Sequence, residues 1–405
     1  MKILLDREDS TPDIADNEGR TPLSWAAEFG WVDMVEMLLE KGNVTPNTSD
    51  KGGRTALSWA AGNGSWGVAK ILLEREGVTP DTPDKCGRTP LSWAASHGDA
   101  EVAQMLLGWE GVTPDTTDKG GRTPLSWAAE LGHVGTVKML LEQEDVIPGT
   151  QDKDGRTPLL WAAINGHEKV LKGLLEQDDI TPDAPDKVGR TPLLWAARNG
   201  HRGVVNKLLE LENVTPTTAD EDGRTPLSWA AGNGRQGVAK MLLDREDVTP
   251  NVANNDGRTP LSWAAEFGCM DMVEILLEQR DVTPNTADKG GRIPLSWAAE
   301  LGHVGTVKML LERDDVTPCA EDREGRTPLL WAAANGREGV VKMLLDREDV
   351  TPNTWDKGGR TALSWAARGG YDGVVKIFLR QEGIAPDIID KDYRTALSCT
   401  AAYKN

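Results

Sequence analysis

Two glycine-rich segments of this 405-residue sequence match a motif that binds dinucleotide cofactors. Residues 62–67 and 232–237 both read G-x-G-x-x-G, the pattern that lets backbone N–H groups approach a pyrophosphate. The motif works only where a strand precedes the glycines and a helix follows them. Both segments are instead predicted to lie in a turn between two short helices. We therefore expect no cofactor at either place.

Histidine, cysteine and carboxylate residues are the other groups that could do chemistry. Four histidines directly follow a recurring glycine and are 34 residues or a multiple of 34 apart: His133, His167, His201 and His303. The cysteines, which have no metal-ligand spacing, are Cys86, Cys269, Cys319 and Cys399. Acidic pairs such as Glu144-Asp145 follow the ends of predicted helices and are interpreted as solvated surface. We expect histidines that close turns, unpaired thiols, no metal site and no catalytic residue.

The charge of the chain limits the classes of partner. There are 64 acidic residues against 45 lysines and arginines, which gives a formal net charge of -19. Nucleic acids and anionic membranes attract clustered positive charge, so neither is an expected partner. Two interpretations stay open: recognition of a partner with a basic surface, and solubility of a long chain. The sequence has no apolar run long enough to span a membrane and no secretory signal in residues 1–15, so we expect an intracellular, cytoplasmic location, with the nucleus left open.

A 34-residue period organises the sequence. The motif Gly-Arg-Thr-Pro-Leu recurs with its glycine at 19, 87, 121, 155, 189, 223, 257 and 325, and near-copies begin at Gly53, Gly291 and Gly359. We predict eleven full repeats over residues 19–392, a partial repeat at 1–18 and another at 393–405. Both partial repeats break off inside the pattern. We expect a fragment or a truncated gene product, and the alternative is a natural array with frayed ends.

Each repeat is predicted to fold as two short helices and an extended turn. Thr21 and Pro22 suit a helix start, because threonine caps free N–H groups and proline lacks one. Gly30 is expected to end that helix, and residues 33–40 carry apolar side chains at helical spacing. Neither helix is long enough to be stable alone, so neighbouring repeats must stack and share a core.

These residues resemble the ankyrin repeat. The family pattern is approximately G-x-T-P-L-H-x-A-A followed by a second helix that ends in Leu-Leu, and residues 19–27 read Gly-Arg-Thr-Pro-Leu-Ser-Trp-Ala-Ala. The resemblance covers essentially the whole chain. It implies an all-α solenoid of stacked helix–turn–helix units with β-turn fingers, a right-handed curved array with a concave groove. It also implies a protein partner in that groove, and neither an enzyme nor a small-molecule ligand.

Two features depart from the family pattern. The histidine after Pro-Leu, which normally ties the helix to the turn by hydrogen bonds, is serine or leucine here, as at Ser24 and Leu160. Serine can replace part of that bonding, whereas leucine cannot. The linker contains Val-Thr-Pro, and tryptophan precedes Ala-Ala. This variant is similar to arrays in large fungal ankyrin proteins, where the array often forms the sensor end of a multidomain, NLR-like protein.

Eleven tryptophans occupy one position of the repeat, from Trp25 to Trp365. Such a row could bind a partner, because tryptophan is frequent in binding hot spots. The position lies beside the predicted buried alanine pair, however, and does not vary between repeats. We therefore predict that the tryptophan row packs in the core or between repeats. Cys399 stands at the twelfth position.

Positions that differ between repeats are the better candidates for recognition. They flank the helix-ending glycine or lie at the tip of the turn. In ankyrin arrays these positions line the concave groove. The exposed aromatic residues predicted to contact a partner there are Phe29, Trp31, Trp66, Phe267, Trp355 and Tyr371. For each of them the alternative is partial burial against a neighbouring repeat.

Three functional hypotheses result from these patterns. The first is a scaffold that binds a protein partner on its first helices and turns. The second is the sensor segment of a larger NLR-like signalling protein, whose other domains would lie outside these residues. The third is an enzyme or a small-molecule binder, which needs a deep polar pocket with convergent titratable groups.

One copy of the repeat carries a change that should weaken it. Residues 291–312 repeat residues 121–142 with a single difference, Ile293 in place of Thr123. The isoleucine side chain cannot accept a hydrogen bond at a helix N-terminus, and the loss of such a cap costs about 1 kcal/mol. We therefore expect Ile293→Thr to raise the denaturant midpoint of unfolding. An unchanged or lower midpoint would contradict this prediction.

Overall fold

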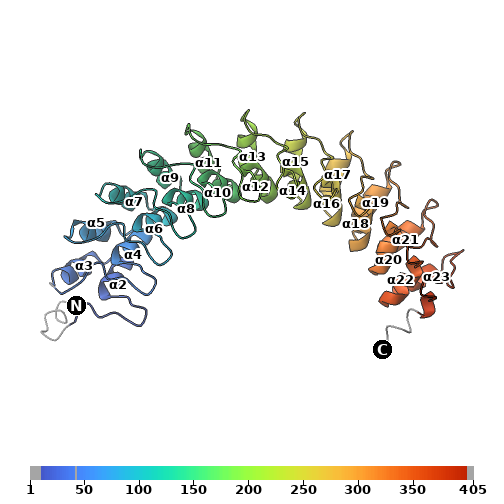
Figure 1. Ribbon diagram of the computed structural model, residues 1–405, viewed down its shortest axis with the longest axis horizontal. Helices are drawn as coiled ribbons and strands as arrows, with labels where there is room; N and C mark the ends of the chain where they lie inside the picture. Colours follow the sequence, from blue (N-terminus) through green and yellow to red (C-terminus); the bar gives the residue numbers. More distant parts are fainter. Residues whose placement is uncertain (1–10, 42, 399–405) are drawn as a thin grey trace. The chain divides into compact units, whose positions relative to one another are not determined.

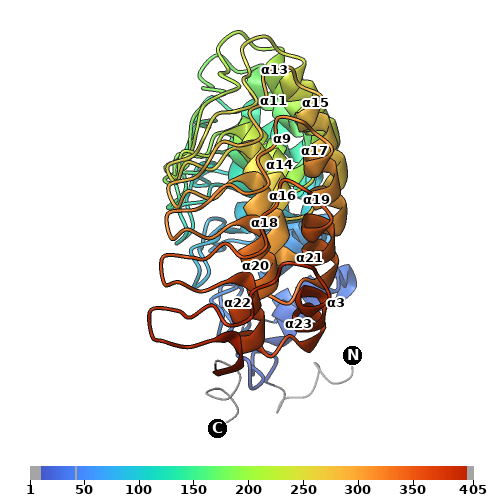
Figure 2. The same cartoon turned by 90° about the vertical axis from the view of Figure 1, so that its right-hand side faces the viewer.

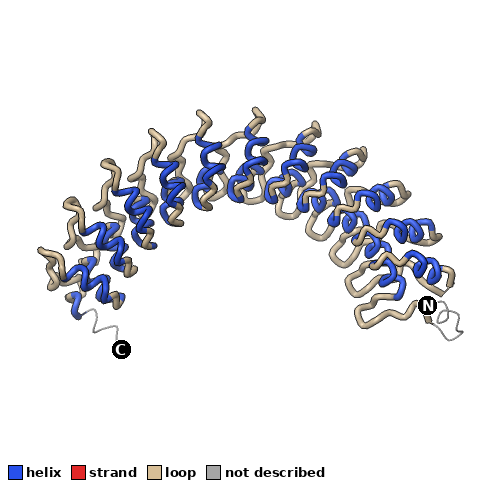
Figure 3. Tube along the Cα trace, turned by 180° about the vertical axis from the view of Figure 1, so that it is seen from behind, coloured by secondary structure: helices blue, strands red, loops and turns tan. Residues whose placement is uncertain are grey.

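The computed structural model describes residues 11–41 and 43–398. These residues form helices joined by turns, and the β-type pairing among them is an isolated bridge between Trp355 and Thr361 (Figures 1 and 3). The all-α prediction is confirmed. Cys399 and the outer parts of both predicted partial repeats lie outside the described residues.

The chain divides into two compact units. Unit 1 contains the residues up to Ala196 together with Gly203–Val214, and unit 2 contains Ala197–Arg202 and the residues from Thr215 onward. Helices α12 (Pro192–Asn199) and α13 (Arg202–Leu209) carry residues of both units. Within each unit, the same pair of helices recurs in every repeat.

Each repeat contains a first and a second helix of similar length. In unit 1 the first helices are α2 (Pro22–Glu28), α4 (Ala56–Gly62), α6 (Pro90–His97), α8 (Pro124–Leu131) and α10 (Pro158–Asn165). Its second helices are α3 (Val32–Leu39), α5 (Trp66–Glu74), α7 (Ala100–Leu107), α9 (Val134–Leu141) and α11 (Glu168–Leu175). In unit 2 the first helices are α14 (Pro226–Gly232), α16 (Pro260–Glu266), α18 (Pro294–Leu301), α20 (Pro328–Ala334) and α22 (Ala362–Gly369). Its second helices are α15 (Gln236–Leu243), α17 (Met270–Leu277), α19 (Val304–Leu311), α21 (Glu338–Leu345) and α23 (Asp372–Leu379).

Threonine starts the first helices, as predicted. The side-chain oxygen of Thr55 accepts the N–H of Ser58 at 3.3 Å and shares a second hydrogen bond with the Ser58 hydroxyl. Where leucine replaces the serine, as at Leu160, the backbone bond to the threonine remains. Several first helices end at a glycine in the left-handed conformation, for example Gly98 with φ of 80°.

Ile293 occupies the capping position without making the cap. Its φ and ψ are -86° and 164°, close to the -83° and 165° of Thr123. Thr123 accepts the N–H of Ser126 and also bonds its hydroxyl. In the later copy the N–H of Ser296 donates to the Ile293 carbonyl, and the buried Ser296 hydroxyl has no partner. The isoleucine therefore leaves a buried hydroxyl unsatisfied as well as a helix without its cap.

The core of each unit lies between its first and second helices. In most repeats the leucine and two alanines of the first helix are buried with a valine and at least one leucine of the second, as are Leu57, Ala60, Ala61, Val68 and Leu72. In the last repeat Phe378 takes the place of the buried leucine. Because the alanine side chains are small, first helices of neighbouring repeats can approach closely. In unit 2, the second helices lie on one side of the first helices and the hairpin-like turns extend on the other (Figure 2).

The turns of successive repeats are hydrogen-bonded to one another. The N–H of Lys85 donates to the Gly52 carbonyl at 2.7 Å, and equivalent bonds recur along each unit. Gly53 makes room for this contact, because its φ is +84° and a Cβ there would lie 2.6 Å from the Lys85 nitrogen. The motif glycine is therefore required both by its own backbone conformation and by the neighbouring turn.

A second link between turns depends on the residue after Thr-Pro. The side-chain oxygen of Asn47 accepts the N–H of Thr79 at 3.1 Å, and its amide donates to the Gly77 carbonyl at 2.7 Å. Asp81 takes the same position one repeat later, where its carboxylate can only accept, as it does from the N–H of Thr113. Its other oxygen is buried without a partner. Burial raises the pKa of Asp81.

We expect Asp81→Asn to stabilise unit 1 by about 1 kcal/mol at pH 7, because the new amide can donate as Asn47 does. The gain should depend on pH. A raised pKa means that the folded state binds the proton more tightly than the unfolded chain, so the carboxylate destabilises the fold above its folded-state pKa. The advantage of asparagine should therefore shrink as the pH falls through that pKa. Denaturant unfolding of the variant and the parent chain at neutral and acidic pH measures this difference in stability.

Asn47→Asp is the matched control and should have the reverse effect. It removes the donor to the Gly77 carbonyl and should lower the unfolding midpoint at neutral pH. If Asp81→Asn and the parent chain have equal midpoints at every pH, the unpartnered oxygen of Asp81 carries no energetic cost.

Candidate functional site

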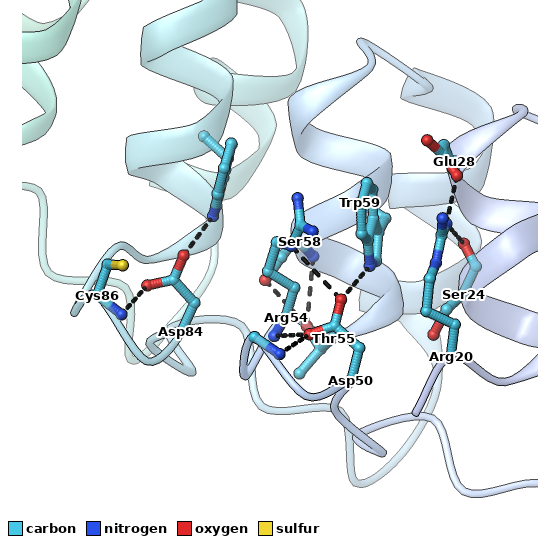
Figure 4. A network of polar contacts seen from close by, with 12 residues as sticks. Arg20, Ser24, Glu28, Asp50, Arg54, Thr55, Ser58, Trp59, Asp84 and Cys86 are labelled. Carbon is cyan, nitrogen blue, oxygen red and sulfur yellow. Dashed lines mark hydrogen bonds and ion pairs between the residues drawn. The ribbon is translucent and has the colours of Figure 1, made fainter. Parts of the chain in front are cut away.

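An aspartate in nearly every turn, buried in most of them, holds the tryptophan row in place. One carboxylate oxygen of Asp50 accepts the backbone N–H groups of Gly52 and Arg54 at 2.8 and 2.9 Å, and the other accepts the indole N–H of Trp59 at 3.1 Å (Figure 4). The aspartate is thus shared between the turn and the first helix. The same indole contact recurs in nine other described pairs: Asp16–Trp25, Asp84–Trp93, Asp118–Trp127, Asp152–Trp161, Asp186–Trp195, Asp220–Trp229, Asp288–Trp297, Asp322–Trp331 and Asp356–Trp365.

The arginine of the repeat motif stacks on these tryptophans. The Arg20 guanidinium lies 3.5 Å from the centroid of the Trp25 ring and 3.8 Å from that of Trp59 in the next repeat. In unit 2, Arg224 is held between two indoles in the same way, and burial lowers its pKa to about 10, so it stays charged at neutral pH. The tryptophans therefore pack between repeats, at an edge of the core where most of them remain partly exposed.

The turn before Trp263 departs from this pattern, because Asn254 replaces the aspartate. Its side-chain oxygen still accepts the backbone N–H groups of Asp256 and Arg258, at 3.0 and 2.9 Å. Its amide nitrogen cannot accept the indole proton, and the Trp263 N–H is buried without a partner. The Arg258 guanidinium lies 3.6 Å from the Trp263 centroid, and burial lowers its pKa. This turn therefore lacks the carboxylate that, in other repeats, accepts both the backbone N–H groups of the turn and the indole N–H of the tryptophan.

Residues considered for cofactor or metal chemistry have structural contacts. The Nε2 atoms of His133 and His167 lie 3.2 and 2.9 Å from the carbonyls of Ser96 and Glu130, one repeat earlier. These histidines were predicted to close their own turns, and the structure shows that they also join neighbouring repeats. Residues 62–67 run from the last residue of α4 into the first turn of α5, with no strand before them in the described chain. Among the described residues, no three His, Cys, Asp or Glu side chains are grouped so that they could hold a metal ion.

Two of the predicted recognition residues belong to an exposed aromatic cluster in unit 1, formed by Trp25, Phe29 and Trp31. The ring centroids of Phe29 and Trp31 are 5.0 Å apart, and those of Phe29 and Trp25 are 6.0 Å apart, with the rings stacked in both pairs. The exposed fractions are 38% for Trp25, 55% for Phe29 and 52% for Trp31. The first member of the tryptophan row thus contributes to an exposed surface as well as to packing.

The predicted residues of unit 2 lie at three different places in the repeat. Phe267 occupies the position of Phe29 and is exposed at the end of α16. Trp355 is exposed on a turn. Tyr371 directly precedes α23 and covers Gly336 of the preceding repeat, where an added Cβ would lie 2.5 Å from its ring. Phe267 makes a looser contact of the same kind, because an added Cβ at Gly232 of the preceding repeat would lie 3.6 Å from its ring.

Trp66 is the first residue of α5 and lines a groove between α5 and α7. The sequence grouped it with the ends of the first helices, whereas the structure places it on a second helix. Trp109, just after α7, lines the same groove and was not among the predicted residues. A signal was available, since other repeats have residues such as Gln143 and Gln177 at that position.

Family models match nearly the whole chain. The model described as ankyrin repeats (3 copies) matches residues 1–84, 67–151, 144–220, 209–288, 248–322 and 281–354, and the ankyrin repeat model matches residues 358–391. The chain belongs to the ankyrin repeat family. Ankyrin repeats are generally protein–protein interaction modules. A comparison with curated proteins finds no match. In the part of the array that the structure describes, no helix is both long and apolar enough to cross a membrane.

We expect Asn254→Asp to stabilise the ankyrin array by about 1 kcal/mol. The new carboxylate can accept the Trp263 indole N–H while it keeps both backbone bonds of the turn. Asp288→Asn, one repeat later, is the matched opposite, because it removes the acceptor 3.1 Å from the Trp297 indole nitrogen. Its unfolding midpoint should fall. Identical midpoints for the parent and both variants would show that the indole bond adds nothing to stability.

Proposed function

We propose that this ankyrin array is a scaffold that binds a protein partner through the ends of its first helices and the residues that follow them. The scaffold would consist of eleven full repeats over residues 19–392, between partial repeats at 1–18 and 393–405. The framework positions are buried and nearly constant, whereas residues beside the helix-ending glycine differ between repeats and are often exposed. A constant framework with a variable exposed edge suits the recognition of a partner that is not itself repetitive.

The aromatic cluster is the observation that supports this proposal most directly. Its three rings stack in series and each exposes more than a third of its surface. Aromatic side chains dominate binding hot spots because covering them removes a large apolar area from water. Asp33 and Glu36 are exposed on α3, directly after the cluster. Their charge favours a partner whose contact surface is basic.

The double variant Phe29→Asn, Trp31→Ser tests this proposal. Both replacements are the residues at the same positions of the next repeat, Asn63 and Ser65, so the fold should persist. We expect proteins captured from a cell extract by the parent array to bind the double variant at least about tenfold more weakly. Circular dichroism and the unfolding midpoint check that the variant is folded.

Val188→Asp is the control for the loss of an exposed apolar side chain. It changes a turn of unit 1 and introduces the residue found at the same repeat position in Asp154, so capture should be unaffected. Equal capture by the double variant and this control contradicts the aromatic cluster as the contact. A parent array that captures no protein contradicts the scaffold itself.

A further inference from the structure

The groove between α5 and α7 carries two tryptophans that are outside the repeated row. Trp66 and Trp109 line it together with Met105 of α7. The exposed fractions of the two tryptophans are 45% and 37%. No residue of the aromatic cluster lines this groove. It is therefore a second apolar surface of unit 1, built on the second helices.

The two tryptophans lie at opposite ends of the groove. Helices α5 and α7 are successive second helices and lie side by side (Figure 1). Trp66 is the first residue of α5, whereas Trp109 follows the C-cap residue of α7. Because an α-helix rises about 1.5 Å per residue, the length of α5 separates the two ends by about 13 Å. The groove is thus as long as about two and a half turns of a helix.

The rim of this groove is negatively charged. Glu74 of α5 and Glu101 of α7 line it and are exposed. The lysine that lines it, Lys70, lies 3.9 Å from Glu74 and 5.4 Å from the centroid of the Trp66 ring. Part of its charge is therefore offset by Glu74, and Glu101 has no such cation within the groove lining.

A comparison with the equivalent groove two repeats later shows which features are particular to the α5–α7 groove. Between α9 and α11, Val134 stands at the position of Trp66 and Gln177 at that of Trp109. Three lysines line that groove: Lys138, Lys169 and Lys172. The same backbone arrangement thus has neither the aromatic pair nor the acidic character. The aromatic pair with its acidic rim is a property of the α5–α7 groove and not of the repeat.

We propose that the α5–α7 groove binds a basic amphipathic helix of a protein partner, at a surface separate from the one proposed above. A helix can lie along the groove between two neighbouring helices and satisfies its own backbone hydrogen bonds there, whereas an extended peptide would find no strand edge to pair with. Its apolar residues at i, i+3 or i+4, and i+7 span about 10 Å, so they can contact Trp66, Met105 and Trp109. Its arginines or lysines can meet Glu74 and Glu101 and lie over the indole rings.

Synthetic peptides test this inference on the whole chain. The probe is a peptide of about five helical turns, with leucines along one face and arginines on the flanking faces. One comparison peptide has the same composition in an order that leaves no apolar face, and another keeps the leucines but carries glutamate in place of arginine. Fluorescence anisotropy of the labelled peptides measures binding. We expect the probe to bind at least about tenfold more tightly than either comparison peptide.

Variants that copy the α9–α11 groove locate the binding. Trp66→Val, Trp109→Gln and Glu101→Lys each install the residue found two repeats later, so the array should remain folded, as unfolding midpoints can verify. Each should weaken probe binding at least about tenfold. Val134→Ala, in the other groove, should leave binding unchanged. The Phe29→Asn, Trp31→Ser variant should bind the probe as the parent does, which separates this result from a failure of the proposed scaffold surface.

Tight probe binding that requires both tryptophans and Glu101 supports the inference. No binding of the probe, equal binding of the peptide without an apolar face, or undiminished binding by the two tryptophan variants overturns it.

Discussion

The aspartate carboxylate of the turn, present in all but one of the described aspartate–tryptophan positions, is the contact on which the rest of the repeat is built. In Asp50, one oxygen fixes two backbone N–H groups of the turn and the other fixes the indole of Trp59 on the following helix. One side chain therefore sets both the conformation of the turn and the position of the helix. In the usual ankyrin pattern a histidine ties the helix to the turn, and in this variant the aspartate–tryptophan pair has taken over that role. Trp263 shows what the carboxylate contributes: where asparagine replaces aspartate, Arg224 and Arg258 still stack on the ring, but the indole N–H is left without an acceptor.

Contacts between repeats are built on this fixed indole. Once the tryptophan is held, its ring offers a surface to the arginine of the same repeat and to the arginine of the preceding one, as Trp59 does to Arg54 and Arg20. The histidine or arginine after the helix-ending glycine adds a bond to a carbonyl of the preceding repeat, as for His133 and Arg337. All of these contacts act between nearest neighbours, as expected for a solenoid.

Most of the fold could be predicted from the sequence because the repeat is unbroken and each of its residues has a local physical reason. The threonine cap, the helix-ending glycine and the buried alanine pair depend on backbone geometry within one repeat. The aspartate–indole bond and the arginine stack were missed, although both residues recur in nearly every repeat. Their contacts depend on how turns and neighbouring repeats are placed, which apolar periodicity does not describe.

The candidate binding residues likewise have some features that the sequence predicts and others that it does not. The exposure of Phe29 and Trp31 could be predicted, because most other repeats have polar residues at these two positions. The stacking of Phe29 on Trp25 and of Trp31 on Phe29 depends on side-chain rotamers and could not be predicted. Trp109 was not predicted, because it follows a second helix and reaches a candidate surface only through the packing of that helix against the one that carries Trp66.

The two departures at Asn254 and Ile293 have a joint consequence for unit 2. They affect successive repeats, so an unsatisfied indole on α16 lies next to an uncapped start of α18, and these two helices pack against each other. In an array held together by nearest-neighbour contacts, the repeat pair with the weakest bonds opens first, before the array unfolds as a whole. Amide exchange and proteolytic nicking should therefore be concentrated there. Two substitutions in otherwise near-identical copies are thus enough to make one pair of repeats in unit 2 easier to open than its neighbours.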